Sequence, residues 1–418
     1  MRGKKIHLLW NRGLPAIMRG GKRRLGALLI SMSEFVSLRL PLQDTLVLEC
    51  ESDMDDNPRA FYEYLLTVGW NRKHRIVWLV SNPSFFMKYY RKKNVVFINR
   101  RESHAFSRIR LNYYLSTAKY FVFSHPYWFV KRRKNQIIVN VWHGTPIKAA
   151  SNVSPNFVSS FDYICVPTEE SKEVYEKGLC CPQEKMVVCG PPRLDLLKKQ
   201  DKNTVFSKLF AWNAEEKVVV CLPTYRQSSA HQDSVLEDRF TLEVIQSKED
   251  FQRVDSFLHS NKMHLIIKPH PLQLREGLST ENGMNIHYID NQLMLEKKIQ
   301  LYELIGCCDG LLTDISSVYF DFLLLNRPIG LLTRDKDRYQ RGLIDIKTLH
   351  TLPGENVDSL ESLFIFLRNV ATGKDYLAKE RAYISKLFNR SIDIPYSEEL
   401  ARFLFHDGII PGNQIDQA

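Results

Sequence analysis

The sequence contains no long hydrophobic run. Of its 418 residues, 44% are hydrophobic and 25% are charged, as is ordinary for globular proteins. Its longer apolar runs, such as residues 26–30 and 323–325, are far shorter than the roughly 20 residues that cross a bilayer. The N-terminus also lacks a long apolar core followed by small residues. We therefore expect neither a membrane-spanning helix nor a secretory signal.

Cysteine spacings typical of zinc sites or disulfide frameworks are absent. Eight cysteines are scattered, and the two adjacent pairs, Cys180-Cys181 and Cys307-Cys308, do not have C-x-x-C spacing. This usage favours a reducing cytoplasm and predicts no metal site. There is no G-x-S-x-G nucleophile motif, no internal repeat and no recognised nucleic-acid-binding motif, so we do not expect a nucleic-acid partner.

Positive charge is concentrated in two blocks. The net charge of the whole chain is +11, residues 1–40 carry +8 and residues 88–134 carry +12, so the remainder is acidic. Two basic surfaces on an otherwise acidic protein predict a polyanionic partner or an anionic membrane surface.

The first basic block predicts an amphipathic helix. Apolar residues recur at helical spacing behind the basic run 22–24; they are Leu25, Leu28, Leu29, Met32 and Val36. Such a helix is able to lie on an anionic bilayer. The alternative is a helix that packs on the body of the protein and keeps its basic residues in water.

From about residue 46, short strand-like runs alternate with helical patterns. The runs are 46–50, 75–80, 95–98, 120–123, 137–142, 163–166, 186–189, 218–222, 265–267, 286–288, 310–312 and 329–332. Alternation of this kind predicts an α/β protein with parallel sheets covered by helices on both faces. We expect two doubly wound, Rossmann-like domains over residues 45–197 and 198–418, preceded by a basic segment over 1–44. Ligands of such sheets bind beyond the carboxyl ends of the strands.

The stretch from Asp309 to Pro328 predicts a strand, a turn and a helix. Asp314 is the expected N-cap, and apolar residues at 315, 318, 319, 322 and 323 form one helical face. Ser316 and Ser317 then lie in the first turn, where hydroxyls and free N–H groups suit an anion such as phosphate. The alternative is that both serines only cap the helix.

Four further polar clusters follow predicted strands. His143 comes after the run 137–142, where it suits a general base; alternatively, it is satisfied by backbone hydrogen bonds. Arg193 follows 186–189, and Arg226 with Thr224 follows 218–222. Each arginine suits a phosphate or forms a surface ion pair. Two prolines fix the backbone around Lys268 and His270 after 265–267. Together with the two serines, these donors suit a diphosphate in a cleft between the domains.

Five strings in one order resemble a known family. They are VWHGTPIK (141–148), GPPRLDLL (190–197), LPTYR (222–226), IIKPHP (266–271) and LYELIGCCDGLLTDISSVYFDFLLLNRPIG (301–330). The sequence is similar here to the CDP-glycerol glycerophosphotransferases, which include teichoic-acid primases and polymerases and related capsule enzymes. Residues 56–59 also resemble a family element, whereas Ile315 departs from the usual tyrosine.

The resemblance implies a glycosyltransferase-B-like architecture with the active site between the domains. It also implies transfer of glycerol phosphate, or in some members ribitol phosphate, from a CDP-alcohol to a hydroxyl of a lipid-linked acceptor, with release of CMP. His143 would deprotonate that hydroxyl. His270 with Lys268 would stabilise negative charge on the pyrophosphate, and Ser316 and Ser317 would hold phosphate oxygens.

The remaining site residues implied by the resemblance are substrate contacts. They are Gly144, Thr145, Arg193, Thr224, Arg226, Thr313 and Asp314. Asp314 is assigned to the N-cap first, because a carboxylate repels a diphosphate unless it binds a sugar hydroxyl or a metal. The expected partners are CDP-glycerol or CDP-ribitol, a polyprenyl-diphosphate-linked acceptor and an anionic membrane surface, at the cytoplasmic face of the membrane. No cofactor is implied, and dependence on a divalent cation stays open. The alternatives are a nucleotide-sugar glycosyltransferase of the same architecture and a non-enzymatic protein that binds polyanions or membranes.

Overall fold

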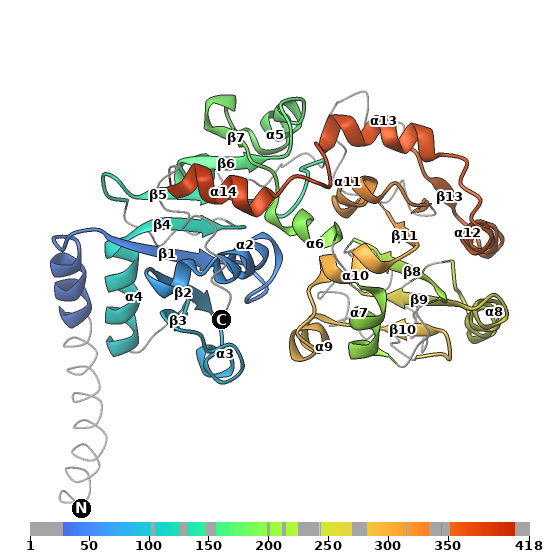
Figure 1. Ribbon diagram of the computed structural model, residues 1–418, viewed down its shortest axis with the longest axis horizontal. Helices are drawn as coiled ribbons and strands as arrows, with labels where there is room; N and C mark the ends of the chain where they lie inside the picture. The colour runs from blue at the N-terminus through green and yellow to red at the C-terminus, as the bar shows by residue number, and fades with distance from the viewer. Residues whose placement is uncertain are drawn as a thin grey trace, which may run out of the picture.

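The computed structural model describes most of the chain. The described residues are 28–101, 105–125, 132–147, 156–198, 201–210, 215–224, 242, 244–269, 282–314, 316–333, 344 and 352–405. They form an α/β protein with two units, each built on a parallel sheet, and the units lie beside each other in Figure 1. This arrangement confirms the predicted fold class at the level of two parallel-sheet domains.

The first unit contains a seven-stranded sheet in the order β3-β2-β1-β4-β5-β6-β7, parallel throughout. Its strands are β1 (Gln43–Glu49), β2 (Arg75–Val80), β3 (Val95–Asn99), β4 (Ala118–Phe123), β5 (Ile137–Asn140), β6 (Tyr163–Val166) and β7 (Met186–Val188). The strand order reverses between the neighbours β1 and β4. Strands β2 and β4 are almost entirely buried, as expected for parallel strands covered on both faces.

The second unit contains a six-stranded parallel sheet in the order β10-β9-β8-β11-β12-β13. Its strands are β8 (Lys217–Leu222), β9 (Met263–Ile267), β10 (Ile286–Tyr288), β11 (Gly310–Thr313), β12 (Ile329–Leu332) and β13 (Glu355–Val357). The order reverses between β8 and β11. Every strand-like run expected from the sequence forms a strand, whereas β13 was not expected because its three residues include two polar ones.

Helices cover both faces of each sheet. They are α2 (Asp56–Thr67), α3 (Pro83–Tyr89), α4 (Ala105–Thr117), α5 (Lys172–Leu179), α6 (Asp195–Lys198), α7 (Lys202–Leu209), α8 (Lys248–Ser260), α9 (Asn291–Glu296), α10 (Leu301–Cys307), α11 (Val318–Phe322), α12 (Leu360–Thr372), α13 (Ala378–Phe388) and α14 (Tyr396–Phe405). Single 3-10 turns include η4 (Pro192–Leu194) and η6 (Leu323–Leu325). One large apolar cluster contains residues of both units, and two smaller ones lie within single units.

The last helix returns to the first unit. Figure 1 shows α14 beside β5 and β6, far from the second sheet. Its residue Phe405 is buried, with its ring centroid 4.8 Å from that of Trp70 and 5.0 Å from that of Tyr120. At the other end of α14, the carboxylate of Asp195 accepts the backbone N–H groups of Tyr396 and Ser397, both at 2.8 Å. The division expected near residue 197 stays a prediction, and α14 lies with the first sheet although it follows the second.

The predicted N-cap of the helix after β11 is wrong. Helix α11 begins at Val318 with Ser317 at its N-cap position, whereas the carboxylate of Asp314 accepts hydrogen bonds from another loop. The predicted apolar positions in the described part of this stretch, 318, 319, 322 and 323, are all buried. Because α11 has only five residues, its dipole would add little to the predicted binding of an anion, which would depend mainly on the serine hydroxyls.

Residues 28–37 form a helix with several exposed apolar side chains. The basic run 22–24 and Leu25, which completed the predicted amphipathic pattern, lie outside the described residues. In the described part of the chain, none of the helices has both the length and the apolar character needed to cross a bilayer.

Candidate active site

The predicted site residues lie on loops that follow central strands. In the first unit His143 follows β5, which pairs with β4. In the second unit Thr224 follows β8, Lys268 follows β9, and Asp314 follows β11. The pair β8 and β11 flanks the reversal of strand order, where open α/β sheets bind ligands. Local sequence explains this placement, since each apolar strand ends in a turn that carries polar residues.

Two neighbouring aromatic rings pack against His143. The ring of His125 lies parallel to it, with a centroid distance of 4.3 Å and an interplanar angle of 2°, and Trp142 lies 4.1 Å away on a tilted plane. Nδ1 of His143 is 3.2 Å from the carbonyl oxygen of Ser124. A carbonyl only accepts, so Nδ1 carries the proton. The side chain is still exposed to solvent, and the edge that remains open carries Nε2 in its unprotonated form.

The surroundings of His143 favour the neutral ring. Although part of the His143 side chain is open to solvent, desolvation by the groups packed around the ring lowers its pKa from 6.5 to about 4; His125 and Arg193 act in the same direction, while Asp56 and the carbonyl of Ser124 oppose them. A histidine that is neutral near pH 7, with one nitrogen fixed as donor and the other open, has the state that a general base requires.

Gly144 brings the loop after β5 against the second unit. Its φ is +138°, and a Cβ built on it would lie 2.1 Å from Oγ of Ser317 and 3.2 Å from Nη2 of Arg193. No larger residue fits there without displacement of the backbone or of Ser317. The residue next to His143 therefore touches Ser317, so the predicted base and one predicted phosphate ligand come from different units and meet at one place.

Arg193 joins the two units. It is 4% exposed; Nη1 donates to Asp56 on α2 at 2.6 Å and Nη2 to Asp321 on α11 at 2.7 Å. The ring of Tyr302 on α10 lies 4.7 Å from the guanidinium carbon, and its hydroxyl also donates to Asp321. Asn57 accepts the backbone N–H of Arg193 at 3.0 Å. A role for Arg193 as a diphosphate ligand stays a prediction, and its contacts give it the task of fixing the two units relative to each other.

Thr224, Thr313 and Asp314 connect two loops of the second unit. The buried carboxylate of Asp314 accepts the backbone N–H of Thr224 at 3.0 Å and its hydroxyl at 2.8 Å. The buried hydroxyl of Thr313 donates to the carbonyl of Leu222 at 2.8 Å. These bonds hold the strand ends of β8 and β11 in register, so the three residues support the loops that face the first unit.

Lys268 interacts electrostatically with the first unit. Burial lowers the pKa of Lys268, while Asp55 and Asp290 oppose that shift. Burial, followed by the neighbouring Asp56, raises the pKa of Asp55, and Lys268 lowers it. Asp55 precedes α2, whereas Lys268 follows β9, so this pair also spans the two units. A partly desolvated ammonium of this kind is well suited to receive a phosphate.

Two predicted residues, His270 and Arg226, lie outside the described residues. Thr145 is buried beside Gly144, while Ser316 and Ser317 are partly exposed. Among the described residues, no group of three histidine, cysteine or carboxylate side chains is arranged to bind a metal.

Sequence reasoning gave no role to the loop after β1, although residues 56–59 resembled a family element, and it missed the loop after β4. Asp56 has a φ of +57°, an uncommon conformation for a residue other than glycine, and such conformations gather at functional sites. His125 follows β4 in the same way that His143 follows β5, so the rule that selected His143 was sufficient to find it. Asp321 and Tyr302 lie in the family string 301–330, but their contacts with Arg193 appear only in the folded chain.

The structure thus contains two parallel-sheet α/β units whose polar strand-end loops meet at one place. The sequence matches the family CDP-Glycerol:Poly(glycerophosphate) glycerophosphotransferase over residues 32–406. The chain belongs to this family and is a transferase, as the resemblance implied.

Curated relatives agree with this assignment, and a solved structure shares the fold. A teichoic acid poly(glycerol phosphate) polymerase of Bacillus spizizenii is 26% identical over 311 residues, which is 69% of this chain and 72% of the relative. A teichoic acid glycerol-phosphate primase of Bacillus subtilis is 24% identical over 390 residues, which is 86% of this chain and 91% of the relative. The structure of the wall teichoic acid polymerase TagF superposes with a TM-score of 0.75 at 20% identity, over 96% of this chain and 97% of that one. That likeness establishes the fold.

Proposed function

We propose that this protein transfers glycerol phosphate from CDP-glycerol to a hydroxyl of a lipid-linked teichoic-acid or capsule-type acceptor and releases CMP. Family membership over residues 32–406 and relatives that are a teichoic acid polymerase and a teichoic acid primase support the reaction. The single observation that carries it is the contact of Gly144, beside His143, with Ser317 of the other unit. CDP-ribitol is the competing donor.

In the proposed step, the acceptor oxygen attacks the β-phosphorus of the donor. A new phosphorus–oxygen bond forms, the bond from that phosphorus to the bridging oxygen breaks, and CMP leaves with the bridging oxygen. The hydroxyl proton passes to Nε2 of His143, which is free to accept it because Nδ1 carries the other proton and because the lowered pKa keeps the ring neutral at pH 7.

The phosphates require cationic and hydrogen-bonding partners. We assign these roles to Lys268 with His270, and to the hydroxyls of Ser316 and Ser317. Arg226 and the backbone around Gly144 and Thr145 supply further donors, while Arg193, Thr224, Thr313 and Asp314 hold the surrounding loops. Negative charge that grows on the leaving phosphate is stabilised best by donors fixed before the reaction.

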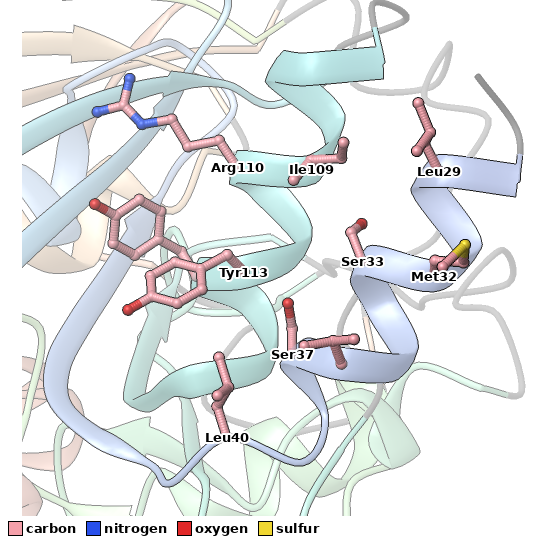
Figure 2. A pocket seen from close by; sticks show the side chains of 10 residues that line it. Leu29, Met32, Ser33, Ser37, Leu40, Ile109, Arg110 and Tyr113 are labelled. Atoms are coloured by element: carbon pink, nitrogen blue, oxygen red, sulfur yellow. The ribbon is translucent and has the colours of Figure 1, made fainter. Parts of the chain in front are cut away.

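An apolar groove beside the helix of residues 28–37 supports binding of the protein to a membrane surface. Figure 2 shows this groove, of about 580 Å³, between α4 and the helix of residues 28–37. Leu29 and Met32 line it from one helix and Ile109 and Tyr113 from the other. Exposed apolar side chains continue over the helix, with Phe35 58% exposed. We propose that this face lies on the cytoplasmic leaflet and that the preceding basic residues attract anionic lipids, at about 1 kcal/mol each.

Some arginines of the second basic block, residues 88–134, form ion pairs and hydrogen bonds with other residues of the protein. Arg100 pairs with Glu49 and Asp53, and Arg133 donates to the carbonyls of Ser116 and Leu40. We therefore assign the membrane attraction mainly to the N-terminal block.

A donor panel tests the reaction. The full-length protein is incubated with a polyprenyl-diphosphate-linked acceptor in anionic vesicles and with CDP-glycerol, CDP-ribitol, a UDP-sugar or a GDP-sugar. We expect CMP release and a mass increase of one or more glycerol phosphate units from CDP-glycerol. Turnover only with a nucleotide sugar contradicts the proposal.

Vesicle binding tests the membrane face. The double variant Met32→Glu/Phe35→Glu is expected to sediment less with anionic vesicles than the native protein, because two charges then lie on the apolar face. The matched control is Met284→Glu, since Met284 is 70% exposed on the second unit. Equal sedimentation of the double variant and the control contradicts the assignment of this face.

A further inference from the structure

His125 forms an ordered contact with His143 that the proposed reaction does not use. It follows β4, and its ring lies parallel to that of His143 at a centroid distance of 4.3 Å. Backbone connectivity does not impose this contact, because the two histidines belong to different strand-end loops. The strand-end rule that selected His143 also points to His125, but the proposed reaction gives His125 no role.

The ring of His125 is held by hydrogen-bonding partners on both nitrogens. Nε2 is 3.0 Å from Oε2 of Glu51, and Nδ1 is 3.0 Å from Oγ of Ser124. The hydrogen bond to His125 lowers the pKa of Glu51 to about 2, so Glu51 is an anion at neutral pH. A doubly protonated His125 has an acceptor for each N–H, since a carboxylate accepts and a hydroxyl oxygen does so as well.

The same serine connects the two histidines. The hydroxyl of Ser124 contacts Nδ1 of His125, while its carbonyl accepts Nδ1–H of His143. The loop after β4 therefore fixes the tautomer of His143 through the backbone and the plane of its ring through His125. Two parallel imidazoles at 4.3 Å repel each other when both are charged.

Charged groups around this pair come from several elements. Asp56 on α2 and Glu51 after β1 favour the charged form of His143, whereas Arg193 on η4 disfavours it. Glu49 of β1 also interacts with His125. Of these groups, only His125 lies against a face of the His143 ring, so it is the one placed to control both charge and orientation.

We propose that His125, held by Glu51, is a positioning residue for His143: it fixes the plane of the imidazole and, when protonated, keeps His143 neutral with Nε2 open to accept a proton. This inference rests on the proposed role of His143 as the base. The proton taken from the acceptor hydroxyl stays on His143 during the transfer step, and His125 exchanges no proton in it.

The variant His125→Phe tests this inference, because it keeps a flat ring over His143 and removes the charge. Histidines are labelled with ¹³C and ¹⁵N, the signal of His143 is assigned from its loss in His143→Asn, and its titration is followed by NMR in the full-length protein. We expect the pKa of His143 to rise by about one unit. In parallel, the acidic limb of the pH profile of kcat/KM is expected to move upward by the same amount.

His74→Phe is the matched control. His74 is another partly exposed histidine whose ring stacks on an aromatic ring, that of Trp70 at 4.5 Å, outside the candidate site. It should leave the titration of His143 unchanged. His125→Asn, which retains a hydrogen-bonding side chain but no ring, serves as the second variant if the phenylalanine variant does not fold.

The outcomes separate this inference from the proposed function. An unchanged titration of His143 in both His125 variants overturns the inference. A shifted titration together with an unmoved rate profile supports the action of His125 on His143 but refutes His143 as the base. Shifts of equal size in both measurements support both.

Discussion

Replacement of Gly144 by alanine tests the contact between the units. The new methyl group would lie 2.1 Å from Oγ and 2.5 Å from Cβ of Ser317, at a φ of +138°. Backbone strain at such angles costs roughly 1–3 kcal/mol, and overpacking costs roughly 1–3 kcal/mol more. The loop and Ser317 lie on different units, so the molecule can relieve the overlap by a small separation of the units.

A small separation of the units would affect both the stability and the activity of Gly144→Ala. We expect Gly144→Ala to lower the unfolding free energy by about 2–4 kcal/mol, somewhat less than the full sum. A displacement near 1 Å between base and phosphate ligands is expected to reduce kcat about 100-fold. Urea unfolding measures the first effect and CMP release the second.

Gly373→Ala is the control for backbone strain alone. Gly373 has a φ of +68° and no atom within 4 Å of a built Cβ, so only the left-handed conformation is penalised, by about 1–2 kcal/mol. Its activity should stay native. Native activity in Gly144→Ala, or an equal loss in both variants, refutes the contact between His143's loop and Ser317.

Three further predictions follow from the geometry. The pKa of His143 falls from 6.5 to about 4 on folding, so the unfolded chain binds more protons than the folded chain between pH 4 and 6.5. The unfolding free energy should therefore rise with pH over this range, and this rise should be missing in His143→Asn. Asp321→Asn removes one partner of the buried guanidinium of Arg193 and should cost about 3–5 kcal/mol in urea unfolding; a loss under 1 kcal/mol contradicts a structural role. Phe405→Ala empties a buried site against Trp70 and should cost about 3–5 kcal/mol, whereas unchanged stability means that α14 does not dock on the first unit.

The sequence was sufficient to predict the strands and the loops that follow them. Short apolar runs that end in turn residues indicate buried parallel strands, so His143, Lys268 and Ser317 were identified before their positions were known. The helix start was misjudged because Asp314 had a better partner in Thr224 than the first turn of α11. Strand β13 was missed because three residues with two polar side chains give no periodic signal.

Contacts between distant residues were beyond sequence reasoning. Arg193 has the composition of a phosphate ligand, yet its two carboxylate partners lie 137 and 128 residues away. The stacking of His125 on His143 depends on the neighbouring positions of β4 and β5 in the sheet, which a single sequence does not reveal. Local patterns thus locate the polar loops, and the strand order decides which of them meet.

Turnover and donor binding by His143→Asn test the central claim most directly. Asparagine keeps a polar side chain of moderate size but cannot accept and hold the proton. We predict that CMP release from CDP-glycerol with acceptor falls by about 10²–10⁴-fold, while the Kd for CDP-glycerol, measured by calorimetry without acceptor, stays within threefold of the native value. Turnover within tenfold of the native rate, with donor binding intact, contradicts His143 as the base.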